Sequence, residues 1–325
     1  MANAAQIVST WIGEYFADTF IVPVVGENSN FDFRAFDVDP AVNKERIDYN
    51  VSELKHVTRK KSTCGFSANG QMDLSERTLE VESFAINLEQ CYSEFYNTVF
   101  RSKLKRGTDI YNLEGTFIQE LFEEMTPITI GKDLYKHGWF GNTSSFAATS
   151  FLGDMNGWFK LFEDDSNVSK ISLATTTGGD LATNAVIDAL RSMWTSNLKL
   201  RGRKSQTSIH ATAQVYDNLL ETFENLGTDV GLTRAFDGTD RLFFRGVEVI
   251  SQDIWDETIT DFSIANPHRL VWVQDGNLRV GTDITNPRSE GKLFFDELEE
   301  KTYFKARMDF GVNFRFADTV AYARG

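Results

Sequence analysis

The chain has 325 residues, of which 41% are hydrophobic and 25% charged, a composition typical of a globular protein that can bury a large apolar core without disulfides or metals. It carries 33 Lys and Arg against 47 Asp and Glu, a formal net charge of −14. This excess of acid argues against a protein whose main task is to grip nucleic acid, because phosphate binding needs clustered cations.

The composition also predicts the compartment. Cys64 and Cys91 are too few for a disulfide framework, and two reduced thiols are favoured over a disulfide that braces a hairpin. The N-terminus lacks the pattern of a signal peptide, and no apolar run approaches the roughly 20 residues that span a bilayer. We therefore expect a protein that is made and kept in a cytoplasm-like compartment, with no membrane partner.

The first third of the chain contains little that could form a core of its own. Residues 1–37 begin with a short helical pattern and then become irregular, which indicates an arm, and residues 38–61 are polar without a clear period. Between 62 and 92 the apolar side chains alternate, but the phase changes near Val81. A change of phase requires a bulge or two separate strands, so this segment predicts an extended hairpin with a poorly packed tip, including Gly70 to Glu82.

Residues 112–137 predict a long helix. An apolar stripe repeats at helical spacing and Pro127 would bend the helix without ending it, while Gly138 is expected to end it. The face opposite the stripe is acidic. The stripe consists of Leu113, Phe117, Ile118, Leu121, Phe122 and Met125, with Ile130 and Leu134 continuing it, and the acidic face includes Glu114, Glu120, Glu123 and Glu124.

A passage rich in Gly, Ser and Thr, residues 141–153, predicts a connection into a second domain with alternating helices and strands. Asp180 and Thr212 are expected to cap two amphipathic helices, the second ending at Gly227. The strands expected here are 208–211, a pair around Gly246 within 242–250, and a hairpin of 269–273 with 278–280 across Asp275-Gly276.

The strongest periodic signal lies near the C-terminus. Seven apolar residues alternate with polar ones over 304–316, which predicts one strand about 40 Å long at the usual strand rise. The apolar face comprises Phe304, Ala306, Met308, Phe310, Val312, Phe314 and Phe316.

Motifs of catalysis, phosphate binding or metal binding are missing from the sequence. His56, His137, His210 and His268 are scattered, and Gly178-Gly179 is expected to form a turn. The run Glu163-Asp164-Asp165, with Asn167, is expected to be a solvated loop in preference to a weak calcium site. The basic runs at 59–61, 101–106 and 199–204 are expected to be solvated in preference to binding nucleic acid, or to be patches that meet an acidic neighbour. We predict no catalytic, cofactor-binding or metal-binding residues, and no enzyme.

Several short strings and the order of the elements resemble the major capsid protein of tailed bacteriophages, which has the α+β fold called Hong Kong ninety-seven. The strings are Leu74–Leu79 running into Phe84–Cys91, then Trp139–Asn142, Phe244–Val249, Asn277–Asp283 and Lys305–Val312. The resemblance divides the chain into an N-terminal arm (1–37), a connection (38–61), an extended E-loop hairpin (62–92), a peripheral domain with a long spine helix (93–149), an axial domain (150–285) and a return to the peripheral domain (286–325).

The resemblance implies a subunit that forms pentamers and hexamers in an icosahedral shell around double-stranded DNA, within a virion assembled in the host cytoplasm. It also implies a separate scaffolding protein, a portal and decoration proteins, with DNA enclosed but not tightly bound. No Lys–Asn crosslink is expected. Two alternatives stay open: the shell protein of an encapsulin-type nanocompartment, and an α+β hydrolase with a non-standard acidic site.

Overall fold

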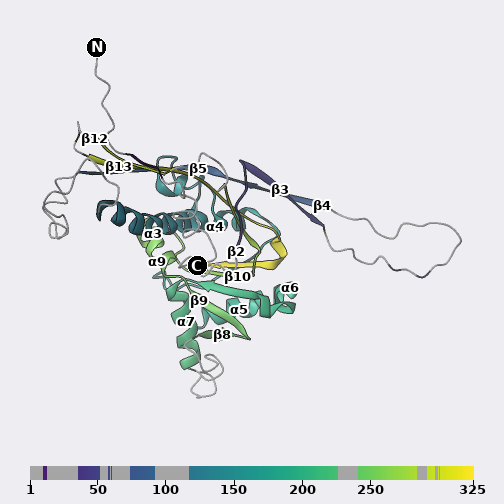
Figure 1. The fold of residues 1–325 in the computed structure, drawn as a ribbon. Helices are drawn as coiled ribbons and strands as arrows, with labels where there is room; N and C mark the ends of the chain where they lie inside the picture. Colours follow the sequence, from purple (N-terminus) through teal and green to yellow (C-terminus); the bar gives the residue numbers. More distant parts are fainter. Residues whose placement is uncertain are drawn as a thin grey trace, which may run out of the picture.

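The computed structural model describes residues 10–12, 36–51, 74–91, 117–225, 241–283, 291–296 and 301–325, together with the single positions 58, 60 and 299. Two six-stranded sheets and one two-stranded sheet make up the strands of this part of the chain. In Figure 1 the first large sheet runs along the top of the molecule above a long helix, and the second lies below that helix. The two-stranded sheet extends away from both.

The strand at the centre of the upper sheet is β13, Lys301–Phe314. It pairs with three antiparallel neighbours along its length, in the strand order β1-β12-β13-β11-β2 with β5 also on β13. The predicted apolar face is confirmed from Phe304 to Phe314, all buried, while Phe316 lies beyond the strand and is 42% exposed. The other strands of this sheet are β1 (Thr10–Ile12), β2 (Phe36–Asp39), β5 (Glu82–Cys91), β11 (Leu278–Thr282) and β12 (Gly291–Asp296).

The predicted long helix is α3, Phe117–Phe140, and it continues through Pro127 as expected. Gly138 does not end the helix, which continues to Phe140. This glycine instead lets the helix approach α4 (Trp158–Asp164) and the upper sheet closely. A Cβ there would lie 3.1 Å from the Trp158 side chain and 3.5 Å from that of Val312. Ile130 and Leu134 are buried, whereas Met125 is 58% exposed, so the C-terminal half of the helix anchors it to the core.

The lower sheet has the strand order β6-β14-β10-β7-β9-β8. Its central strand β10 is buried on both faces: Val271 and Val273 pack into the core that contains α3, and Leu270 and Trp272 into the core of α5 and α7. The strands are β6 (Ser169–Ser172), β7 (Thr207–Ala211), β8 (Leu242–Phe244), β9 (Val247–Ser251), β10 (Arg269–Gln274) and β14 (Val320–Arg324). The helices are α4 (Trp158–Asp164), α5 (Ala185–Ser196), α6 (Leu198–Gly202), α7 (Ala213–Glu224) and α9 (Asp253–Asp261), with 3-10 turns η3 (Phe151–Gly153), η4 (Lys204–Gln206) and η5 (Ala317–Thr319).

Two expectations about this sheet are wrong. Gly276 does turn the chain with a φ of +71°, but β10 and β11 do not pair as a hairpin. Both edges of β10 are occupied by β7 and β14, so β11 continues into the upper sheet and pairs with β13 and β2. The C-terminal residues likewise do not all return to the upper sheet, because β14 pairs with β10 and β6.

The helix caps are confirmed only in part. The helix expected after Asp180 begins at Ala185, behind Asn184 in the left-handed conformation, so Asp180 is not its cap. Thr212 does occupy the N-cap position of α7, but its side chain does not cap the helix. The free N–H of Ala213 instead donates to the Asp256 carboxylate of α9 at 2.8 Å.

The N-terminal third differs most from expectation. Thr10–Ile12 is a strand on β12 and not part of a helix. Within the segment 62–92, the described residues 74–91 do not pair with one another. β4 (Leu74–Glu80) pairs with β3 (Glu45–Val51), in the segment expected to be a connection, and β5 pairs with β13. The phase change near Val81 therefore marks two strands of different sheets, and Leu79 and Val81 are buried rather than loose.

Candidate assembly surfaces

The β3–β4 hairpin projects from the body of the molecule (Figure 1). One face of β3 exposes large apolar side chains: Ile47 is 44% and Tyr49 63% exposed. The other face is covered only at the base of the hairpin, where Leu79 and Val81 pack against Val42. A two-stranded hairpin is marginally stable by itself, so this one depends on its base and on whatever covers its exposed face.

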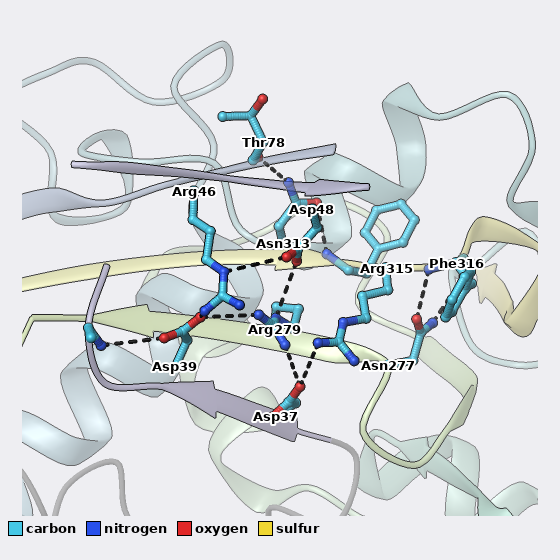
Figure 2. Close-up of polar contacts among 12 residues, drawn as sticks. Asp37, Asp39, Arg46, Asp48, Thr78, Asn277, Arg279, Asn313, Arg315 and Phe316 are labelled. Atoms are coloured by element: carbon cyan, nitrogen blue, oxygen red, sulfur yellow. Dashed lines mark hydrogen bonds and ion pairs between the residues drawn. The ribbon is translucent and has the colours of Figure 1, made fainter. Parts of the chain in front are cut away.

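The base is fixed by a network of ion pairs centred on Arg279 of β11 (Figure 2). The Arg279 side chain is 4% exposed and reaches carboxylates of two other strands: Asp37 and Asp39 of β2, the latter at 3.2 Å, and Asp48 of β3 at 3.5 Å. Arg46 of β3 also pairs with Asp39. The network therefore ties the hairpin to the upper sheet through a buried centre, Arg279 with Asp39, and more exposed partners at its edge, Asp37 and Arg46.

Such a network is costly to break from one side. Asp39 is 6% exposed, and removing Arg279 would leave its buried carboxylate paired only with the half-exposed Arg46. Removing one partner of a buried ion pair costs about 3–5 kcal/mol in other proteins. A second tie lies on β4, where Arg77 pairs with Asp165 at the end of α4 and stacks 4.0 Å from the centre of the Phe314 ring. Burial would raise the pKa of Asp165, but the Asn167 N–H and Arg77 outweigh it and lower that pKa.

A second apolar surface is a groove of about 430 Å³ between β5 and α3. Exposed apolar side chains stand around it: Leu88 (43%) lines it from β5, and Met125 (58%) from α3. Ile128, on the same helix, is 51% exposed. Large apolar side chains gathered in this way on a free subunit are typical of a surface that another chain covers.

His137 lies at the floor of this groove, with its ring 4.1 Å from that of Phe151 and 5.0 Å from that of Phe84. Burial among these rings lowers the pKa of His137 to about 4, although the charge of Asp154 opposes the shift. Burial also raises the pKa of Asp133, one turn earlier on the helix. His137 is therefore neutral near pH 7 and becomes costly to keep buried in acid.

The remaining residues singled out in the sequence have structural partners. Glu163 pairs with Arg269 (3.5 Å) and Arg324, and Asp164 with Lys160 (2.6 Å), so this acidic run is not an open calcium loop. His210 contacts Gln252 at 2.9 Å. His268 contacts the Gly179 carbonyl at 2.9 Å, and Gly179 lies in a turn with φ +91°.

Within the described ranges, no group of three or more His, Cys, Asp or Glu side chains could hold a metal ion. Lys199 of the last basic run pairs with Asp318, and the other basic runs lie largely or wholly outside the described residues, as do His56 and Cys64. The side chains of Glu114, Glu120, Glu123 and Glu124 are also outside the description. No described helix is both long and apolar enough to cross a membrane.

The Arg279 network was not anticipated from the sequence. Arg279 is separated from Asp37 by 242 residues, and no local period connects them. The available signal was a charge inside the apolar strand Leu278–Thr282, which requires a buried partner from elsewhere in the chain.

No family model and no curated protein matches the chain. Several solved structures, in contrast, match most of the chain. A structure of Mycobacterium phage Ogopogo is 15% identical, with a TM-score of 0.57, and the match covers 90% of each chain. The procapsid of satellite phage P4 with its size determination protein is 10% identical, with a TM-score of 0.57 and coverage of 90% of this chain and 86% of that one.

The capsid of a native GTA particle, computed with C5 symmetry, is 10% identical with a TM-score of 0.54, covering 90% of this chain and 88% of that one. At sequence identities this low, the matches establish the fold and nothing further. The chain has the α+β fold of tailed-phage major capsid proteins, the Hong Kong ninety-seven type.

Proposed function

We propose that this chain is the major capsid subunit of a tailed bacteriophage and assembles with copies of itself into a closed icosahedral shell around double-stranded DNA. The observation that carries the proposal is the match of about 90% of the chain to solved structures of phages and phage capsids. The shell would be built in the host cytoplasm and form the outer wall of the virion.

The described surfaces support assembly through copies of the same chain. The hairpin exposes Ile47 and Tyr49 on an arm held rigidly at its base by Arg279. A rigid projecting arm with an apolar face stabilises a neighbour at little cost in conformational entropy, because its base is already ordered. Pentamers and hexamers of such subunits would bury this face and close the shell.

The reported neighbours are capsids of phages and of a GTA particle, which favours a genome container over a compartment that packages an enzyme. They are structural proteins, and the described histidines and the acidic run serve packing and ion pairs here. A hydrolase has no support from these contacts. A scaffolding protein, a portal and decoration proteins are the further partners that the proposal includes.

Electron microscopy of the full chain, expressed with a scaffolding protein from the same genome, tests the proposal. We expect closed icosahedral particles, together with pentamers or hexamers before closure. Only monomers under these conditions would contradict it. Particles that contain a packaged enzyme instead of DNA, isolated from the native host, would favour the encapsulin-type alternative.

The proposal also predicts weak intrinsic affinity for DNA, since the net charge of −14 repels phosphate. A gel-shift titration of the isolated subunit at about 50 mM salt is the sensitive test, because low salt favours phosphate contacts. We expect no binding below micromolar concentration. Submicromolar binding that falls steeply with salt would contradict this part of the proposal.

A further inference from the structure

The two ends of strand β7 in the lower sheet carry opposite charge. The residues just before β7 are basic and exposed: Arg201 on α6, and Arg203 with Lys204 at η4. Arg245 stands at the same end, because only Gly246 separates it from β9, which runs parallel to β7. We call Arg201, Arg203, Lys204 and Arg245 the basic end.

The opposite end of the same strands is acidic. α7 begins directly after β7, and its exposed Asp217, Glu221 and Glu224 are spaced to lie along one face of the helix, which contains no Lys or Arg. Asp253 opens α9 directly after β9. We call Asp217, Glu221, Glu224 and Asp253 the acidic end.

The two ends are well separated in space. β7 has five residues, so its ends lie about 17 Å apart at strand rise. Figure 1 shows α6 on one side of the lower sheet, with α7 and α9 on the other. The negative charges reinforce one another: the pKa of Asp256, which bridges α9 to the start of α7, is raised by burial and further by the charges of Asp253 and Asp217.

Exposed apolar surface adjoins the basic end. Leu198, the first residue of α6, is 65% exposed, and Phe316, just before η5, is 42% exposed. The two segments are held together by the ion pair of Lys199 with Asp318. An apolar patch with a charged rim is typical of a protein–protein interface.

We propose that the basic end of one subunit binds the acidic end of the next copy, so that identical lower-sheet domains join head to tail into closed rings. A contact between two different patches of one chain is heterologous, and repeating it generates a ring when the rotation closes. The partner is a second copy, because the chain itself supplies the complementary charge. This inference rests on the proposed function and assigns the residues that pair neighbouring subunits.

Charge reversal at each end tests the pairing. One variant carries Arg201→Glu, Arg203→Glu and Lys204→Glu, and the other carries Asp217→Lys, Glu221→Lys and Glu224→Lys. All six side chains are exposed, and thermal unfolding followed by circular dichroism should confirm that both variants fold. Native mass spectrometry of the full chain, expressed with its scaffolding protein, then measures the fraction of subunits in rings.

We expect each variant alone to form about tenfold fewer rings than the wild-type chain, since like charges would face each other. A mixture of the two variants should form rings again, but only rings with an even number of subunits, because the two kinds must alternate. Hexamers should return and pentamers should not. A chain that carries all six substitutions keeps the net charge of −14 and should form both, as the wild type does.

A control with Lys132→Glu, Lys305→Glu and Arg307→Glu makes the same change in net charge as the first variant, at exposed positions outside the lower sheet. It should form rings normally. Equal loss in this control, normal rings in either single variant, or no recovery in the mixture would overturn the pairing. DNA binding lost in the first variant, with rings unaffected, would show that the basic end serves nucleic acid instead. A wild-type chain that forms no rings would instead contradict the proposed function.

Discussion

The lower sheet and the β3–β4 hairpin are built on opposite principles. Every residue of β7 is buried, and β10 packs into cores on both of its faces. The hairpin has one covered face only at its base and exposes Ile47 and Tyr49 beyond it. One region thus obtains its stability within the subunit, while the other has apolar surface left for another molecule.

This difference explains how charge is used in each region. In the lower sheet the apolar cores carry the stability, and we infer that the exposed charges at its ends select a neighbouring copy. At the hairpin the core is small, and a buried ion-pair network holds the orientation instead. Buried ion pairs contribute geometry more reliably than net stability. A projecting arm that must meet a neighbour at a set angle needs that geometry.

The largest effect should come from placing a charge in the self-sufficient part. Phe310 is 4% exposed on the buried face of β13. Phe310→Asp should lower the free energy of unfolding by about 4 kcal/mol or more, because it removes a buried ring and buries a carboxylate. Urea unfolding checks this. Asp309→Ala, on the opposite face, should cost less than about 1 kcal/mol. Similar losses at both positions would overturn the register of β13.

Breaking the network at the hairpin base should have the next largest effect. Arg279→Ala leaves the buried carboxylate of Asp39 with only the half-exposed Arg46 as a partner and should lower the free energy of unfolding by about 3 kcal/mol. Hydrogen exchange of the free subunit should show faster exchange in β3 and β4, with β7 and β10 protected as before. Arg279→Lys keeps a charge but not the guanidinium fork, so its free energy of unfolding should lie between those of the wild type and Arg279→Ala. Uniform loss of protection throughout the chain would mean that the network supports the whole fold.

Acid should weaken the subunit through His137. Its pKa is about 4 in the folded chain against an ordinary value of 6.5, so the unfolded chain binds a proton first as pH falls. The stability from neutral His137 is complete above about pH 6.5 and is lost progressively toward pH 4, by about 3 kcal/mol. His137→Phe should remove this part of the pH dependence. The raised pKa values of Asp133 and Asp256 stabilise the folded chain as the pH falls, but they do so equally in the wild type and in His137→Phe. If the free energy of unfolding depended on pH identically in the wild type and His137→Phe, His137 would not be the source of the acid sensitivity.

The smallest effect on the free subunit should come from the exposed face of the hairpin. Tyr49→Ser should change the free energy of unfolding by less than about 0.5 kcal/mol, because the ring is 63% exposed. It should nevertheless reduce the yield of closed particles seen by electron microscopy. Glu76→Ser, at the position paired with Tyr49 on β4, is a matched control that removes no apolar surface. Equal particle yields for Tyr49→Ser and the wild type would mean that Tyr49 faces solvent in the shell.

Local sequence patterns predicted the elements that can be recognised without knowing which strand or helix they pack against. β13 was evident from its alternation, because one face is buried within its own chain, and the turn at Gly246 and the start of α7 were equally local. Pairings were not. Asp275-Gly276 predicts a turn but cannot reveal that β14, about 45 residues later, occupies the edge of β10. β3 escaped notice because it buries too little apolar surface to show a period. The surfaces at 199–204 and on α7 were visible as charge, but their placement at opposite ends of one strand required the sheet order.

A cryo-EM reconstruction of particles assembled from the full chain tests the central claim, that the exposed hairpin is completed by another copy. The account predicts that the side chains of Ile47 and Tyr49, exposed in the free subunit, lie buried against a neighbouring subunit. It also predicts that the Arg279 network at the base is unchanged. A shell in which this face of the hairpin stays in contact with solvent, or a chain that forms no shell, would contradict it.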